Sequence, residues 1–199
     1  FFVPVSVTIN TPAVTFLRLI GLAGDDTFNI EGPSPFTAGI QVQGGDPSGS
    51  DSLVLTGTSG DDAIVLNLAA GAVTGLGGGP ISMTGVENLS ISGGGAATVD
   101  AFSVLELGAA SELHYVTLAG ASAANLAVSG TVNDDVFVVT PTGDGSGEFY
   151  AAGVKGPLFT YGGFGVGGVV SFAGGGRYNI LRILGSEDVD VIDTSAAAV

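Results

Sequence analysis

The sequence predicts an all-β protein, and three observations carry the prediction. Glycine interrupts almost every window of the chain, at 35 of 199 residues. The runs between the glycines are short and rich in Val, Ile, Thr and Phe, which disfavour helix and favour strands. Clusters of Gly, Asp, Asn, Pro and Ser separate these runs, as expected for tight turns between strands.

Strands are expected wherever an apolar run of this kind occurs. The ranges are 2–9, 14–20, 27–30, 40–43, 52–57, 63–68, 81–84, 87–92, 113–118, 126–130, 136–140, 148–153, 169–174, 178–184 and 189–193. Many short strands with regular turn signals are typical of a sandwich, a barrel or a solenoid.

Internal repetition favours a parallel β-solenoid among these architectures. SLVLTGTSGDDAIVL and NLAVSGTVNDDVFVV share two apolar runs, a Gly-Thr step and a double Asp. The glycines that open such corners are Gly21, Gly57, Gly93 and Gly130, spaced by 36, 36 and 37 residues. In a solenoid, equivalent corners stack at about the 4.8 Å spacing of strands. A pair of Greek-key β-sandwiches is the alternative fold.

The domain organisation expected is a single module over residues 1–199. If the chain divides, LGAASE is the best boundary, which gives halves 1–107 and 108–199. The longer interval from Gly130 to Gly185 indicates an insertion over TPTGDGSGEF and YGGFGVGG. The chain starts at Phe1 without Met or a basic leader, so we expect a mature or excised piece of a larger protein.

Composition argues against several functional classes. The chain carries 19 acidic residues against four Lys and Arg, for a formal charge of −15. Phosphate backbones and anionic membrane surfaces both require basic residues, so no nucleic acid and no membrane partner is expected. No apolar stretch reaches the roughly 18 residues of a membrane span. The absence of cysteine removes any disulfide framework and fits a secreted bacterial protein.

The corners carry paired acids. GLAGDDTF from Gly21 and GTSGDDAI from Gly57 follow the pattern G-G-x-G-x-D-x-U-x, in which U is a large apolar residue, except at the second glycine. GTVNDDVF from Gly130 and GSEDVDVI from Gly185 keep the first glycine, the aspartate and the apolar residue. These segments resemble the hemolysin-type calcium-binding repeats of the repeats-in-toxin family, which also occur scattered in large bacterial surface proteins.

The resemblance implies a set of calcium ligands. In that family the glycines allow a tight turn, and aspartate and carbonyl oxygens bind Ca²⁺. The ligands implied here are Asp26, Asp62, Asp135 and Asp190, with Asp25, Asp61, Asp134 and Asp188 beside them. The family's repeats run in tandem, whereas these are about 36 residues apart. A full cage therefore requires corners from different coils to stack.

Two interpretations of each acidic corner stay open. Stacked carboxylates repel one another and the chain has few basic residues, which favours a bound cation. Aspartate also bonds its own backbone in a tight, solvated turn that needs no metal. The loops around Asp46, Asp51 and Asp144 are further candidates for metal binding, but they lack EF-hand spacing.

No catalytic residue is expected. Alternation places Leu17 and Leu19 inward and Arg18 outward, so a surface ion pair is the expected role of Arg18, with Arg182 at the equivalent repeat position. The sole histidine, His114, lies in an apolar run, and the chain has no G-x-S-x-G motif. The expected role of the aromatic residues Phe149, Tyr150, Phe159, Tyr161 and Phe164 is to cover the end of a core, with sugar stacking as the alternative.

The function expected is structural: an extracellular module of a cell surface, surface layer, stalk or filament, stabilised by Ca²⁺ at its acidic corners. Its partners are expected to be copies of itself or neighbouring modules, because the ends of a solenoid must be capped or paired. FFVPVSVTI at the start of the chain is a candidate strand for donation to a neighbour. A carbohydrate-binding adhesin module is the alternative function, and a polysaccharide lyase or hydrolase is less favoured.

Overall fold

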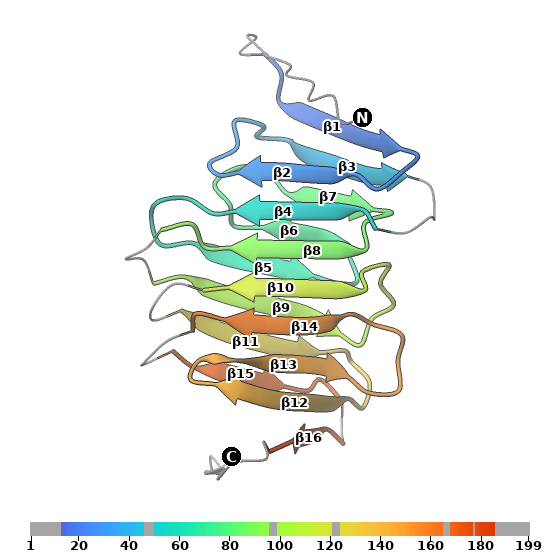
Figure 1. Ribbon diagram of the computed structural model, residues 1–199, viewed down its shortest axis with the longest axis vertical. Coiled ribbons are helices and arrows are strands. Elements are labelled where there is room, and N and C mark those ends of the chain that lie inside the picture. The colour runs from blue at the N-terminus through green and yellow to red at the C-terminus, as the bar shows by residue number, and fades with distance from the viewer. Residues whose placement is uncertain are drawn as a thin grey trace.

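The computed structural model describes residues 13–45, 50–95, 99–120, 124–164, 168–176 and 178–185. Within these ranges the chain forms sixteen β-strands and no helix, which confirms the all-β class (Figure 1). Accordingly, the described part contains no helix that is long and apolar enough to cross a membrane.

The strands form two eight-stranded sheets. Sheet A consists, in spatial order, of β1 (Phe16–Leu22), β3 (Gly39–Gly45), β7 (Ile81–Thr84), β6 (Ala72–Thr74), β5 (Ala63–Asn67), β9 (Ala101–Leu107), β11 (Asn125–Gly130) and β15 (Val170–Ala173). Sheet B consists of β16 (Ile180–Ile183), β12 (Val136–Gly143), β13 (Ser146–Ala151), β14 (Leu158–Gly162), β10 (Tyr115–Ala119), β8 (Asn88–Ser92), β4 (Ser52–Thr56) and β2 (Thr27–Glu31). Both sheets contain strands from before and after residue 107.

The chain passes back and forth between the two sheets. β1 lies in sheet A, β2 in sheet B, β3 in sheet A and β4 in sheet B, and the alternation resumes after β7. Most returns place a strand parallel to an earlier strand of the same sheet, with matched register in pairs such as Ser52↔Asn88 and Asn88↔Tyr115. The pairing of β9 with β11 shifts register between Val128 and Gly130. The turns that lead from sheet A to sheet B, called A-to-B corners below, lie on the opposite side of the stack from the B-to-A corners (Figure 1).

Two antiparallel excursions interrupt this alternation. β5, β6 and β7 form a meander within sheet A, and β12, β13 and β14 form one within sheet B. The second meander contains the TPTGDGSGEF segment, where the sequence predicts an insertion. The first meander contains GLGGGP between β6 and β7, and nothing in the spacing of the corners predicts it.

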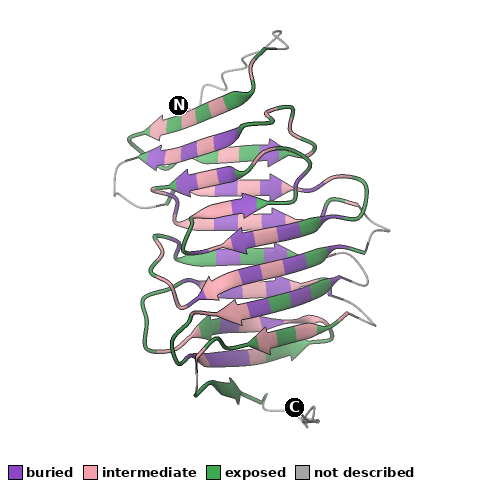
Figure 2. Cartoon of the chain, turned by 180° about the vertical axis from the view of Figure 1, so that it is seen from behind, coloured by how far each residue is buried: buried purple, intermediate pink, exposed green. Residues whose placement is uncertain are grey.

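One hydrophobic core fills the space between the sheets. Along each central strand, buried side chains alternate with partly exposed ones, which gives the striped ribbons of Figure 2. In β4, for example, Leu53 and Leu55 are fully buried, while Val54 between them points outward. The core is continuous across both sheets and across both meanders.

Two large mixed sheets with a shared core are equally the architecture of a β-sandwich, the alternative expected from the sequence. Thirteen of the expected strand ranges overlap strands of the structure, whereas 2–9 and 189–193 lie outside the described residues. β6, β9 and β14 were not expected. AFSVLEL in β9 carries the alternation of a half-buried strand, with Phe102 and Val104 buried, so a signal was present.

Candidate functional site

Six corners share one construction, in which an acid or amide at the end of the corner folds back over a glycine at its start. A Cβ built on Gly21 would lie 2.5 Å from Asp26 Oδ2, and one built on Gly57 would lie 2.6 Å from Asp62 Oδ2. The six pairs are Gly21 with Asp26, Gly44 with Asp51, Gly57 with Asp62, Gly93 with Asp100, Gly130 with Asp135, and Gly174 with Asn179. Glycine is required at these corners because any side chain would displace the carboxylate or amide.

The acid first caps the backbone of its own corner. Asp62 accepts hydrogen bonds from the Thr58 backbone N–H at 2.7 Å and from the Thr58 hydroxyl at 3.1 Å. Asp135 does the same with Thr131, through its Oδ1 atom. Asp62 and Asp135 are 7% and 6% exposed, so these bonds replace water that the carboxylates have lost.

Two of the acid pairs also join their corner to the neighbouring corner on the same side of the stack, through one bond that the pair donates and one that it accepts. Asp100 Oδ1 accepts the Asp62 N–H at 3.0 Å, and Asp61 Oδ1 accepts the Val99 N–H at 2.9 Å. We call such a reciprocal pair of bonds an interlayer clamp. The double Asp is therefore explained by hydrogen bonding: the side chain of the first residue accepts, and the backbone of the second donates.

A second interlayer clamp lies at an A-to-B corner, on the opposite side of the stack. Asn179 Oδ1 accepts the Asp135 N–H at 3.1 Å, and Asp134 Oδ1 accepts the Tyr178 N–H at 3.0 Å. Asn179 has the role that Asp100 has in the first clamp. A neutral amide oxygen therefore accepts the same kind of backbone hydrogen bond as the carboxylate does in the first clamp.

A one-sided ladder joins three earlier A-to-B corners. Asp51 Oδ1 accepts the Asp26 N–H at 2.7 Å, and Glu87 Oε2 accepts the Asp51 N–H at 2.9 Å. Asp51 is 1% exposed. The residues joined here are 25 and 36 apart in sequence, whereas those of the two clamps are 38 and 44 apart. The number of residues between stacked corners therefore varies along the chain.

The structure does not gather the predicted calcium ligands at one edge. Asp26 and Asp135 precede β2 and β12 in sheet B, with five strands of that sheet between them. Asp62 precedes β5 in sheet A, at a B-to-A corner on the other side of the stack. The stacking of Asp26, Asp62 and Asp135 that the sequence predicted is wrong. Asp25 is exposed, and Asp188 and Asp190 lie outside the described residues.

The corners differ in their fitness for a cation. At the Asp62 corner, the carboxylate oxygens already accept bonds from Thr58. Asp26 Oδ2 and Asp135 Oδ2, by contrast, are buried and have no hydrogen-bond partner among the residues that the structure describes. Beside Asp135 lies a hollow of about 100 Å³, which Thr131, Asn133 and Asp134 also line. Oxygen-rich surroundings and a buried oxygen that lacks a donor fit a hard cation such as Ca²⁺.

Sequence reasoning missed several of these acceptors. The corner at Gly93 has Thr98 at the position expected for the aspartate. The acid that folds over Gly93 is instead Asp100, two residues later, and it is fully buried. Asp51 was expected to be a loop residue or a metal ligand, and its role as an acceptor between corners was not predicted. Gly44 and Gly93 both precede their acid by seven positions rather than five, and this shared longer spacing was the available signal. Of the other loop candidates, Asp144 is exposed in the β12–β13 turn and Asp46 lies outside the described residues.

Comparisons with known proteins assign neither a family nor a function to the chain. No protein-family model, no curated protein and no solved structure matches the chain. The resemblance of the corners to calcium-binding repeats therefore stays a prediction.

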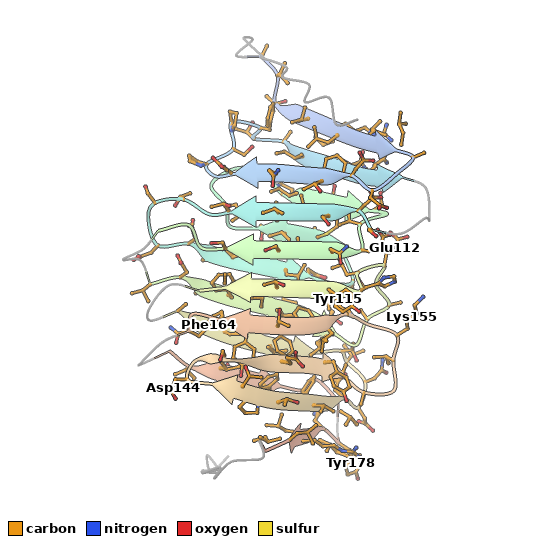
Figure 3. All side chains as sticks on the ribbon, in the orientation of Figure 1. Glu112, Tyr115, Asp144, Lys155, Phe164 and Tyr178 are labelled. Carbon is orange, nitrogen blue, oxygen red and sulfur yellow. The ribbon has the colours of Figure 1, made fainter. Side chains whose placement is uncertain are left out.

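Two of the described basic residues, Arg18 and Lys155, lie on β1 and beside a hollow that two acids also line. Arg18 donates to Gln43 Oε1 at 2.7 Å, which is a hydrogen bond to an amide in place of the expected ion pair. His114 is exposed and lines a hollow of about 330 Å³ with Glu87, Glu112 and Lys155 (Figure 3 labels Glu112 and Lys155). Glu87 accepts the Asp51 N–H and Glu112 accepts the Gly85 N–H, so both carboxylates already bind the backbone of neighbouring corners.

Four of the five clustered aromatic residues lie in the core, in agreement with the first of the two interpretations. Phe149 stacks on Phe159 with ring centroids 4.5 Å apart, and both side chains are fully buried. Phe164 and Tyr161 meet edge to face, and burial raises the pKa of the Tyr161 hydroxyl. Tyr150 alone among the five points outward.

Proposed function

We propose that the chain is a structural module of an extracellular bacterial protein, wound as a parallel β-solenoid that continues into copies or neighbouring modules. Three features support the winding: the alternation between sheets, the parallel registers that it produces, and the hydrogen bonds that join successive corners. A long stack held at its corners suits a stalk, a surface layer or a filament. The formal charge of −15 keeps such a module soluble.

The observation that carries the proposal is the state of the terminal strands. Among the described residues, no strand pairs with the outer edges of β1, β2, β15 or β16. At the β16 end, Leu181 and Ile183 are in register with the core residues Phe137 and Val139, yet they are 49% and 38% exposed. An unpaired edge beside an exposed apolar face favours addition of a further strand. The candidate donor segment FFVPVSVTI lies outside the described residues.

We expect the purified chain to self-associate as its concentration rises, and Leu181→Lys to weaken this association. A charge on an edge strand opposes pairing with another strand. Sedimentation velocity between micromolar and millimolar concentration measures the association, and electron microscopy reveals filaments. Val99→Lys is the matched control, because Val99 is 53% exposed at the corner between β8 and β9, two strands that lie inside their sheets. A chain that stays monomeric throughout, or a Leu181→Lys variant that associates like Val99→Lys, contradicts the proposal.

Calcium enters the proposal at one corner, that of Asp135. With a Kd of about 0.5 mM, which is ordinary for an extracellular module, 5 mM Ca²⁺ stabilises the fold by about 1.4 kcal/mol and raises Tm by roughly 3–5 °C. We expect Asp135→Asn to abolish this rise, whereas Asp62→Asn retains it because the Asp62 oxygens are already bonded to Thr58. Calorimetry in EDTA and then in Ca²⁺ measures the effect. Equal rises in the two variants, or no rise in the wild type, remove calcium from the proposal.

A further inference from the structure

The outer face of four inner strands of sheet B is uncharged and rich in small polar side chains. None of the four neighbouring strands β4, β8, β10 and β14 carries a charged residue, although the chain as a whole has 19 acids. Outward positions on these strands include Ser52, Asn88, Ser90, Thr117 and Thr160. Figure 1 looks onto this face, with its strands running across the view.

These side chains form rows that run along the stack. Parallel pairing in register aligns Ser90 with Thr117 and Thr117 with Thr160. The Thr160 hydroxyl donates to the Thr117 hydroxyl at 3.1 Å. The row therefore offers hydroxyl donors and acceptors at the strand spacing of about 4.8 Å. Glu148, which pairs with Thr160 from β13, marks the end of the uncharged area.

Two exposed tyrosines lie in the neighbouring row, one on each side of Leu158. Tyr115 on β10 is 59% exposed and Tyr150 on β13 is 39% exposed, while the residues next to them, Val116 and Phe149, are buried in the core. Both rings therefore lie on the outer face. Because β14 is the one strand between β10 and β13, the tyrosines are two strand spacings apart, or about 10 Å. A shallow hollow of about 180 Å³ borders Tyr115 and is lined by Ser52, Asn88 and Thr117 among others.

We propose that this face binds a neutral polysaccharide, which lies across the strands with sugar rings on Tyr115 and Tyr150. Aromatic rings provide apolar platforms, and sugar hydroxyls match the serine, threonine and asparagine side chains as donors and acceptors. The negative field of the chain and the absence of basic residues on the face select against acidic glycans. The buried aromatic cluster, which the sequence suggested for sugar stacking, plays no part in this site.

The site does not depend on end-to-end assembly, since every residue of it lies on the central strands of one chain. The test is affinity electrophoresis of the full chain in native gels that contain a soluble neutral polysaccharide: hydroxyethylcellulose, laminarin, xylan, galactomannan or dextran. Pull-down with cellulose and chitin covers the insoluble ones. Alginate and hyaluronate, at the same salt concentration, serve as acidic glycans.

We expect at least one neutral polysaccharide to retard the wild type, and Tyr115→Ala to raise its Kd roughly tenfold. Tyr115→Phe retains the ring and most of the affinity. Tyr178→Ala is the matched control, because Tyr178 is 77% exposed but lies beside β16, away from this face (Figure 3). The proposal is overturned if no neutral polysaccharide binds, if Tyr115→Ala binds like Tyr178→Ala, or if the acidic glycans bind equally well.

Discussion

Replacement of Gly44 by alanine is expected to lower the free energy of unfolding by about 3 kcal/mol. A Cβ at this position would coincide with the Gly85 carbonyl oxygen of the next layer and would lie 2.8 Å from Asp51 Cβ. The carbonyl belongs to the backbone of a packed corner, so neither partner can move aside cheaply. The corner must open, and this weakens the ladder that Asp51 makes to Asp26.

Thermal unfolding measures this effect, and a loss of about 3 kcal/mol corresponds to a fall in Tm of roughly 6–12 °C for a chain of this size. Gly156→Ala is the matched control, because a Cβ at Gly156 has no neighbour within 4 Å. We expect the control to leave Tm unchanged within about 2 °C. Equal effects of the two substitutions would show that the corner is looser than its geometry indicates.

Replacement of Asp100 by alanine is the second large effect, at about 2–3 kcal/mol. Asp100 is fully buried, and its Oδ1 atom accepts the Asp62 N–H. Alanine leaves this buried donor without its acceptor and leaves space where the carboxylate was. Asp100→Asn retains an acceptor oxygen, and Asn179 has this role in the other clamp. We therefore expect the asparagine variant to lose less than half as much stability.

Chemical denaturation of the two variants separates hydrogen bonding from charge. Asp144→Ala removes the same charge from an exposed turn and is expected to change the free energy of unfolding by less than about 0.5 kcal/mol. If Asp100→Asn is as destabilising as Asp100→Ala, the corner requires the negative charge itself. A cation at the corner would then explain the requirement better than backbone capping does.

The equal spacing of the corner glycines shows how a correct pattern led to a wrong alignment. Gly57 and Gly93 do occupy neighbouring layers of one edge, since the Gly57 N–H bonds to Ser92 O. Gly21 and Gly130, however, lie at A-to-B corners on the other side. A simple layer takes 25 residues at the Asp26–Asp51 step, whereas a layer that contains a meander takes 36 at the Asp51–Glu87 step. A layer and a half without a meander is therefore close in length to one layer with a meander, and sequence spacing alone does not distinguish them.

Local features were more predictable than long-range ones. Alternation identified most strands, because each strand has one face in the core, and glycine marked the turns that must be tight. The interlayer clamps depend on which corners become neighbours, and that depends on meanders whose strands, such as AVT in β6, are too short to show alternation. Tyr115 was similarly hidden: the sequence showed a strand, but its position on an uncharged outer face depends on the whole order of sheet B.

The two meanders have a consequence for how such a chain can lengthen. Each adds two strands to one sheet, and an even number of reversals returns the chain to its original direction. The strands that follow therefore pair in parallel with those that came before, as β10 and β14 do. Growth by pairs of strands conserves polarity, whereas a single added strand would invert every later layer. We therefore expect both natural length variants and engineered insertions to add strands in even numbers.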